Sequence, residues 1–228
     1  MCGGCLAQIR PQSVADLCLI CGERVSQLTE QAEPAICGLC QRARPPFQRG
    51  VAFGSYDGTL RELLHLLKYE RVKPAARALA CLLVTAARQL GLKEATVVPV
   101  PLHGQRLRER GFNQSEMIAV AAVRELGRGF VLQGTVLARK RPTVSQTGLT
   151  RHQRRANIRG AFEVRHAERI SGRDVLLVDD VLTTGTTASE CARVLLRAGA
   201  RQVFVATVAR VQKLEVTAEH TAAARATA

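Results

Sequence analysis

The chain has 228 residues, of which 46% are hydrophobic and 23% are charged, ordinary values for a globular protein with one domain and a small accessory unit. Its net charge of +14 is unusual and favours an anionic partner, whether a polyanion, an anionic substrate or an anionic surface. No apolar run approaches the length of a membrane span, and the first residues lack the apolar core of a signal peptide, so we expect a cytoplasmic protein.

The first 45 residues carry three Cys-x-x-Cys pairs, Cys2/Cys5, Cys18/Cys21 and Cys37/Cys40. Fifteen residues separate the second and third pairs, which is the spacing of a four-thiolate zinc site. A redox dithiol is the weaker alternative, because no strand–helix pattern follows a single pair. We therefore predict a zinc-binding segment at 1–45. The second and third pairs are its ligands. The first pair is either half of a further site or takes the place of another pair.

Strands and helices alternate through the rest of the chain. The pattern predicts a linker at 42–49, a strand at 51–56, helices at 60–68 and 73–90, a strand at 96–101, a helix at 115–126, β-like segments at 131–137 and 160–164, a strand at 175–178, a helix at 186–197 and a strand at 202–208. Cys81 and Cys191 lie among apolar helix residues, and we expect both to be buried. The alternation implies a largely parallel, twisted sheet with helices on both faces, in a domain at 50–210. Residues 211–228 predict a helical or disordered tail.

Two segments place arginines where an anion could bind. The predicted loop at 102–114 has Arg106, Arg108 and Arg110 at every second residue after a strand end. We interpret it as an anion clamp, because the planar guanidinium matches phosphate oxygens; a solvated loop is the alternative. Residues 139–159 include seven basic residues and no acid: Arg139, Lys140, Arg141, Arg151, Arg154, Arg155 and Arg159. This composition favours a lid over a polyphosphate or a track for a nucleic-acid backbone over a solvated charged face.

The stretch at 175–187, which reads VLLVDDVLTTGTT, has the pattern of a ligand site. Its four apolar β-formers predict a strand buried on both faces. Asp179 and Asp180 follow at the strand end, where open α/β sheets bind ligands. A loop of Thr and Gly then leads to a helix N-terminus, which favours a phosphate. Because carboxylates accept hydrogen bonds from hydroxyls, the combination indicates a phosphorylated sugar.

The same stretch resembles the phosphoribosyl pyrophosphate (PRPP) signature of type I phosphoribosyltransferases. The whole chain resembles the ComF family, which joins such a domain to a cysteine-rich zinc segment. The other matching stretches are 18–40, Lys68-Tyr69, 98–101, 110–114 (R-G-F-N-Q), Gln146, Arg155 with Asn157, and 160–162. The resemblance covers nearly everything up to about residue 210. It implies a type I phosphoribosyltransferase fold preceded by a small zinc-ribbon-like segment.

The resemblance also implies roles for individual residues. Asp179 and Asp180 would contact the ribose hydroxyls. The residues implied for the 5-phosphate are Thr183, Thr184, Gly185, Thr186 and Thr187. Those implied for the pyrophosphate are Arg106, Arg108, Arg110, Asn113 and Gln114, with Mg²⁺ bridging diphosphate and ribose oxygens. We find no residue that looks like a committed general base, so no catalytic residue is predicted.

Two functions fit these features. The first, implied by the resemblance to the ComF family, is a DNA-uptake protein of natural transformation that binds PRPP-Mg²⁺ and single-stranded DNA, with DNA-uptake helicase or translocation proteins as candidate partners. Its DNA-binding candidates are Arg139, Lys140, Arg141, Arg151, Arg154 and Arg155. With 4% aromatic residues and no tryptophan, DNA contacts would be mainly to phosphates and steeply salt-dependent. The second function is an active phosphoribosyltransferase of nucleotide or cofactor metabolism with an unidentified acceptor.

Overall fold

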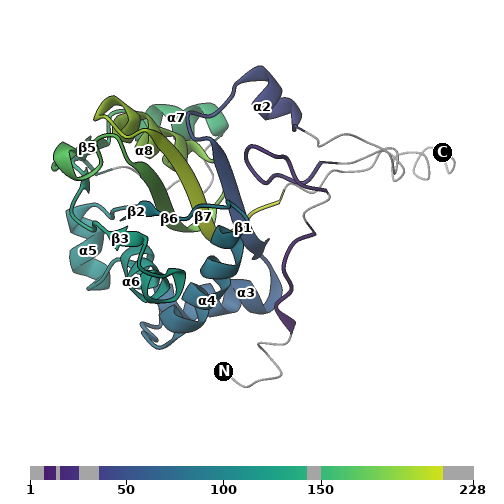
Figure 1. The fold of residues 1–228 in the computed structure, drawn as a ribbon. Coiled ribbons are helices and arrows are strands. Elements are labelled where there is room, and N and C mark those ends of the chain that lie inside the picture. The colour runs from purple at the N-terminus through teal and green to yellow at the C-terminus, as the bar shows by residue number, and fades with distance from the viewer. Residues whose placement is uncertain (1–7, 14–15, 26–35, 143–149, 213–228) are drawn as a thin grey trace, which may run out of the picture.

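A five-stranded parallel sheet forms the centre of the computed structural model, which describes residues 8–13, 16–25, 36–142 and 150–212 (Figure 1). The strand order is β1-β7-β6-β2-β3. The strands are β1 (Arg49–Ser55), β2 (Ala95–Pro99), β3 (Phe130–Leu132), β6 (Asp174–Leu182) and β7 (Gln202–Arg210). All four strand pairings are parallel, which confirms the predicted sheet type.

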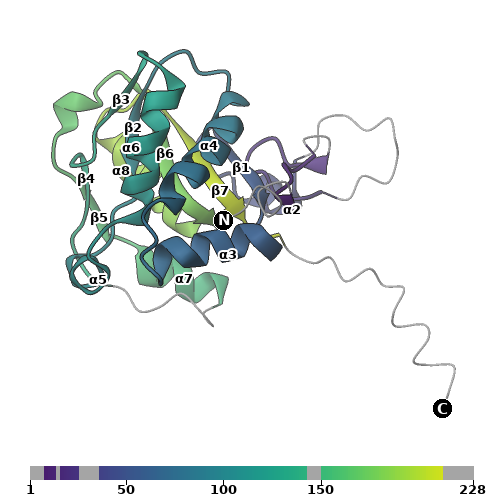
Figure 2. The ribbon, with the colours of Figure 1, turned by 90° about the horizontal axis from the view of Figure 1, so that it is seen from below.

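Helices cover both faces of this sheet (Figures 1 and 2). One face carries α3 (Gly58–Lys68), α4 (Ala75–Arg88) and α6 (Gln114–Leu126). The other face carries α8 (Thr186–Arg197), with α7 (Arg151–Ile158) packed beside it. The smaller elements are α2 (Gly38–Arg42), α5 (Gly104–Arg110), the 3-10 turn η2 (Ala167–Arg169), and an antiparallel pair formed by β4 (Leu137–Arg139) and β5 (Phe162–Val164).

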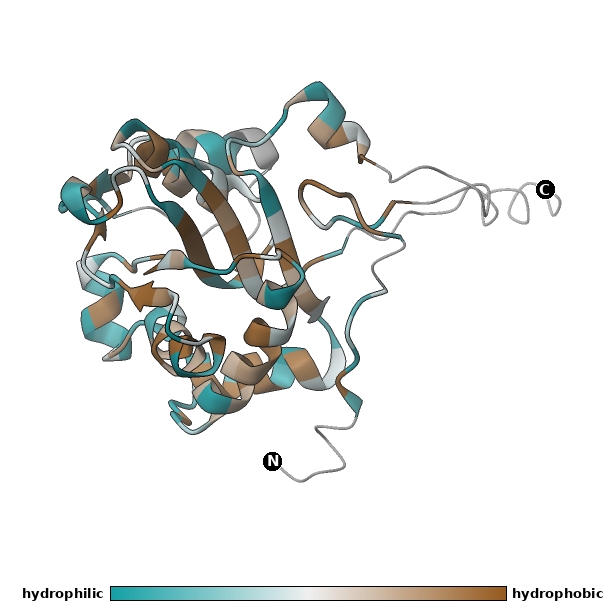
Figure 3. Cartoon of the chain, viewed as in Figure 1, coloured by the Kyte–Doolittle hydropathy of each residue, from teal (hydrophilic) through white to brown (hydrophobic). Residues whose placement is uncertain are grey.

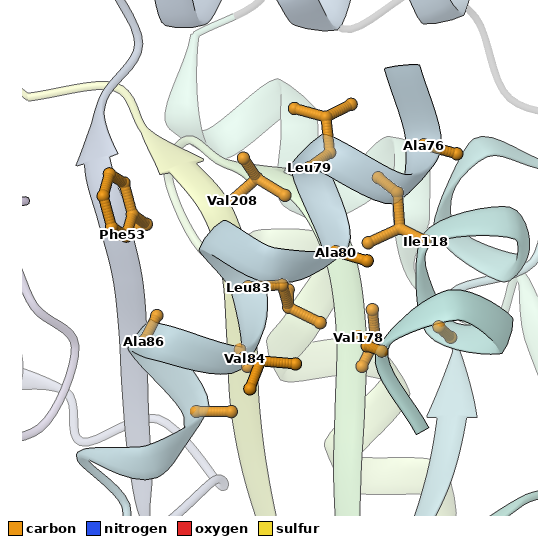
Figure 4. Packing of buried hydrophobic residues seen from close by; sticks show 14 of the residues in the cluster. Phe53, Ala76, Leu79, Ala80, Leu83, Val84, Ala86, Ile118, Val178 and Val208 are labelled. Atoms are coloured by element: carbon orange, nitrogen blue, oxygen red, sulfur yellow. The ribbon is translucent and has the colours of Figure 1, made fainter. Parts of the chain in front are cut away.

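The central strand β6 shows why the sheet is buried on both faces. Leu176 and Val178 belong to the core under α4 and α6, whereas Val175 and Leu177 belong to the core under α8. In the first core, Leu83 of α4 packs with Val178, and such fully buried side chains each contribute about 1.5–3 kcal/mol (Figure 4). The hydropathy colouring accordingly shows apolar strands at the centre and polar segments outside (Figure 3).

Several predicted boundaries differ from the structure. The helix predicted at 73–90 is Ala75–Arg88, with Pro74 as its N-cap. The β-like segment 131–137 is divided into β3 and β4, which belong to different sheets. The strand predicted at 175–178 continues to Leu182, because its pairing with β7 extends to Arg210.

The two helical cysteines have different environments. Cys191 is fully buried, as predicted. Cys81 is exposed, so the prediction for this residue is wrong. The buried stripe of α4 runs through Leu79, Ala80 and Leu83, and the side chain at 81 lies on the solvent side of that stripe.

The N-terminal segment lies along strand β1. The Gln12 amide donates to the Phe53 carbonyl at 2.8 Å, and the Gly50 amide donates to the Ile20 carbonyl at 2.7 Å. Two backbone contacts therefore hold this segment against the edge of the sheet. Within the described ranges, no helix has the length and apolar composition needed to cross a bilayer.

Candidate functional site

The loop at 183–187 joins the end of β6 to the first turn of α8. Gly185 is the N-cap residue and has a φ of 72°, a left-handed conformation that strains residues with a Cβ. In the described structure no side-chain hydrogen bond caps α8, and the positive end of the helix dipole at this loop favours an anion. The hydroxyls of Thr184 and Thr186 lie 2.8 Å apart in the same loop. This geometry suits a phosphate group.

Asp179 and Asp180, in the last part of β6, are held by different partners. Asp179 Oδ1 accepts hydrogen bonds from Ser115 Oγ at 2.8 Å and from the Asp180 amide at 2.9 Å. Asp180 Oδ2 lies 2.5 Å from Lys68 Nζ, and its Oδ1 accepts from the Val181 amide at 2.8 Å. The ion pair occupies Asp180, which is 5% exposed, so the more exposed Asp179 is better placed to accept a ligand hydroxyl.

The two ionisable groups nearest Asp180 have shifted pKa values. Burial, and then the charge of Asp180, raise the pKa of Asp179 to about 7, against the opposing hydrogen bond from Ser115. Burial by itself would lower the pKa of Lys68, but the charge of Asp180 and the hydrogen bond to it outweigh burial and raise this pKa. Lys68 therefore remains an ammonium near neutral pH, where Asp179 titrates.

A cavity of about 810 Å³ opens over the acid pair, and we call it the carboxylate cavity; Lys68, Asp179 and Asp180 line it. Arg106 and Arg110 also line it, whereas Arg108 is not among the described lining residues. The difference arises because residues 104–110 form the helix α5, whereas the sequence predicts a loop at 102–114. Residues four apart on a helix share a face, and a residue two positions away does not.

Asn113 and Gln114 stabilise one wall of the carboxylate cavity. Asn113 is buried, caps the start of α6, and donates from Nδ2 to the Val100 carbonyl at 3.0 Å. Gln114 Oε1 accepts a hydrogen bond from Arg110 Nη1 at 2.6 Å. The Arg110 guanidinium also lies 5.7 Å from the centre of the exposed Tyr69 ring. Gln114 therefore orients Arg110 at the mouth of the cavity.

A second cavity, of about 830 Å³, lies between the cysteine segment, α7 and α8, and we call it the arginine cavity. Six of its described lining residues are Arg44, Arg154, Arg155, Arg159, Arg193 and Arg197. Loop residues Thr183 to Thr186 line it too, and Thr183, Arg154 and Val211 line both cavities. The two cavities thus meet at the loop at 183–187.

The basic segment 139–159 is divided between these cavities and the α7 helix. Arg139 lines the carboxylate cavity, where burial and then the charge of Arg106 lower its pKa. Arg141 donates from Nη2 to the carbonyls of Asn157 at 2.9 Å and Arg159 at 2.7 Å, which fixes the end of α7.

The other candidates of this segment have different positions. Lys140 is exposed and lines neither cavity among the described residues. Arg151 opens α7, but its side chain lies outside the described part of the structure, as does Gln146.

The sulfurs of Cys18, Cys21, Cys37 and Cys40 all lie within 4.8 Å of one another. The Cys21 and Cys37 sulfurs are 3.7 Å apart, and a tetrahedral zinc–thiolate centre requires an edge of about 3.8 Å. The hydrogen bond between Cys21 and Cys18 lowers the pKa of Cys18 and raises that of Cys21, and burial raises the pKa of Cys40, so these closely spaced thiols compete for protons. The cluster therefore fits a zinc ion. Cys2 and Cys5 lie outside the described residues.

Arg210, at the end of β7, connects the cysteine cluster to the sheet. Its Nη2 atom lies 2.8 Å from Glu23 Oε2 and 3.8 Å from Cys21 Sγ. Arg210 is paired in the sheet with Leu182, the residue that precedes the loop at 183–187. One residue therefore contacts the cysteine cluster through its side chain and the end of β6 through its strand pairing.

Lys68, Ser115 and Arg210 received no role from the sequence. A signal existed for Lys68, which follows Leu60 and Leu64 at intervals of four, so that a charged residue falls on the buried stripe of α3. The signal for Arg210 was a cation at the end of an apolar strand. Neither pattern identifies the partner.

Comparison with known proteins adds four findings. The family model described as "Phosphoribosyl transferase domain" matches residues 113–223. The "DNA utilization protein YhgH" of Salmonella typhimurium is 36% identical over 90% of this chain and 88% of its own length. "Competence protein F" of Haemophilus influenzae is 32% identical over 92% of this chain and 90% of its own. Among solved structures, a glutamine PRPP amidotransferase from B. subtilis gives a TM-score of 0.37 at 22% identity, covering 59% of this chain and 26% of that one.

Proposed function

The chain belongs to the ComF family, and on that premise we propose that it binds PRPP with Mg²⁺ at the carboxyl edge of its sheet and binds single-stranded DNA in DNA uptake. The observation that carries the PRPP proposal is the adjacency of three features along this edge. An uncapped helix start, an acid pair and a group of arginines lie in neighbouring cavities that share Thr183.

Each part of PRPP has a matching group. The first turn of α8 and the loop at 183–187 suit the 5-phosphate. Asp179 suits the ribose hydroxyls, and Arg106, Arg110 and Arg139 suit the pyrophosphate. The carboxylates and the diphosphate oxygens are the hard ligands that Mg²⁺ prefers, and the ion would supply charge neutralisation there.

Calorimetry with PRPP-Mg²⁺ tests this site. We expect the double variant Asp179→Asn/Asp180→Asn to lose PRPP binding while keeping a cooperative unfolding transition. A matched control is Asp174→Asn, at the opposite end of the same strand, where the carboxylate pairs with Arg201. Unchanged PRPP affinity in the double variant would rule out the assignment.

The DNA part of the proposal rests on the charge of the chain and on its relatives. The net charge is +14, and two relatives carry the names DNA utilization protein and Competence protein F. We expect a labelled single-stranded oligonucleotide to bind with an affinity that falls steeply as salt rises. Fluorescence anisotropy at several salt concentrations measures this, and the absence of binding at low salt would contradict the proposal.

We also propose a structural zinc ion at the four clustered cysteines. Elemental analysis of protein purified without tags or added metal is expected to give about one zinc per chain. Cys37→Ser should lose the metal, whereas Cys81→Ser on the surface of α4 should keep it. Equal zinc content in the two variants would exclude this cluster as the site.

Turnover of PRPP is the second candidate, favoured by the arginines that line the carboxylate cavity. In displacement at the anomeric carbon, these cations would stabilise the departing pyrophosphate. Incubation with PRPP, with and without DNA, should release pyrophosphate if the protein is an enzyme. No release under either condition would leave PRPP as a bound ligand only.

A further inference from the structure

The arginine cavity has more positive charge than a single 5-phosphate needs. Seven arginines and two glutamates are among its described lining residues. Both glutamates are engaged, because Glu190 pairs with Arg193 and accepts from the Gly160 amide, and Glu23 pairs with Arg210. Even if a zinc–thiolate centre beside the cavity adds two negative charges, the balance remains positive. A sugar 5-phosphate carries at most two negative charges, so the cavity suits a ligand with additional phosphates.

A buried side chain in this cavity also has free donors. Arg210 is 3% exposed, and its Nε and Nη1 atoms have no hydrogen-bond partner among the described residues. Unsatisfied buried donors cost free energy, and a ligand acceptor or a bridging water removes that cost. The donors belong to a cation, so an anionic acceptor is favoured.

The remaining wall of the cavity is apolar. Pro45 and Pro46, which are partly buried, supply accessible apolar surface there, beside the buried side chains of Phe47, Ile158 and Leu182. Apolar faces next to arginines can pack against planar bases while the guanidinium groups contact phosphates. A cavity of this composition therefore fits a nucleotide chain better than a purely inorganic polyphosphate.

The arginine cavity and the carboxylate cavity share the loop that would hold the 5-phosphate of PRPP. We propose that a single-stranded nucleic acid lies in the arginine cavity with one of its phosphates in the loop at 183–187, so that the strand and PRPP exclude each other. This inference rests on the proposed function. It adds that the two ligands compete, and that Arg44, Arg159, Arg193 and Arg197 belong to the strand site.

Competition binding gives a direct test. A labelled single-stranded oligonucleotide is titrated with the protein at increasing PRPP-Mg²⁺. Mutual exclusion raises the apparent Kd for DNA about 100-fold when PRPP is present at 100 times its own Kd. A DNA affinity that stays constant at saturating PRPP overturns the inference while leaving both binding functions intact. Failure to bind DNA or PRPP alone overturns the proposed function itself, together with the inference.

Variants separate the strand site from the PRPP site. Arg155→Ala with Arg197→Ala should weaken DNA binding at least about tenfold and reduce the salt slope by about 0.7 for each lost phosphate contact. PRPP affinity by calorimetry should fall much less than DNA affinity, because these side chains do not line the carboxylate cavity among the described residues and could act only near the 5-phosphate. The matched control is Arg124→Ala with Arg128→Ala, two exposed arginines near the end of α6. Equal weakening of DNA binding by both pairs would reject the cavity as the strand site.

Discussion

Lys68 Nζ and Asp180 Oδ2 lie 2.5 Å apart, and this ion pair ties the last turn of α3 to the strand that carries the ligand site. The side chains are 15% and 7% exposed. Charges this far from water depend on each other, because either one left alone would be poorly solvated. This ion pair therefore affects both the stability of the fold and the electrostatics of the candidate site.

Replacing the lysine should destabilise the protein strongly. In Lys68→Met the Asp180 carboxylate loses its cation, and breaking a buried pair from one side typically costs about 3–5 kcal/mol. Adding Asp180→Asn removes the stranded charge, so the double variant should recover a large part of the lost free energy of unfolding. Urea unfolding of both variants measures the difference. A single variant as stable as the wild type would show that the pair contributes nothing.

The raised pKa of Asp179 gives stability a defined pH dependence. The ordinary pKa is 3.8 and the folded value is about 7, so within this window the unfolded chain binds fewer protons than the native one. The contribution of Asp179 to the free energy of unfolding therefore falls as pH rises from about 4 to about 7, and is constant above. Asp179→Asn should gain stability relative to the wild type across that window. Urea titrations at several pH values test this, and a pH-independent difference would contradict it.

The α5 helix predicts unequal roles for its arginines. Arg106 lines the carboxylate cavity and Arg108 does not, among the residues described. Hydrogen bonds to charged groups contribute about 1.5–3 kcal/mol, so Arg106→Ala should weaken PRPP binding about 10- to 100-fold. Arg108→Ala removes the same charge from the same helix and should leave the affinity unchanged. Calorimetry with PRPP on both variants measures this difference. Equal losses of PRPP affinity would contradict the prediction, because they would indicate a long-range effect of charge.

Arg210 should affect the metal affinity as well as the fold. Removal of a group that hydrogen-bonds to a metal ligand typically lowers metal affinity about 10- to 100-fold, and Arg210→Met removes the contact to Cys21. The matched variant is Arg201→Met, directly before the start of β7, which breaks an exposed pair with Asp174 of β6. Competition with a chromophoric chelator reports zinc affinity. Equal zinc affinities in the two variants would contradict the predicted effect of Arg210 on the metal site.

The sheet could be predicted from local pattern because its strands are short apolar runs separated by amphipathic helices. Residues 175–178 illustrate this, since all four are fully buried in the structure. The α5 helix could not be predicted in the same way. It has no buried residue, so no apolar stripe marks it, and its boundaries depend on capping by His103 and on Gly111.

The residues of the site could be predicted where one short stretch contains them, as at 175–187. The contacts between residues distant in the sequence could not be predicted. Glu23 and Arg210 are 187 positions apart, and only the folded chain brings them together. The basic segment behaves similarly, because the packing of α7 between the two cavities decides which arginine lines which cavity.

Strand β1 lies at one margin of the sheet, and five of its seven residues are buried. The backbone groups on its outer side are met by the Gln12 amide and the Ile20 carbonyl of the N-terminal segment. If that segment detached, an apolar strand with unpaired backbone groups would be exposed, which is a template for intermolecular strand pairing. If the cysteine cluster holds the proposed zinc, its removal by a chelator should therefore lead to self-association before global unfolding, because the metal would keep the N-terminal segment on strand β1.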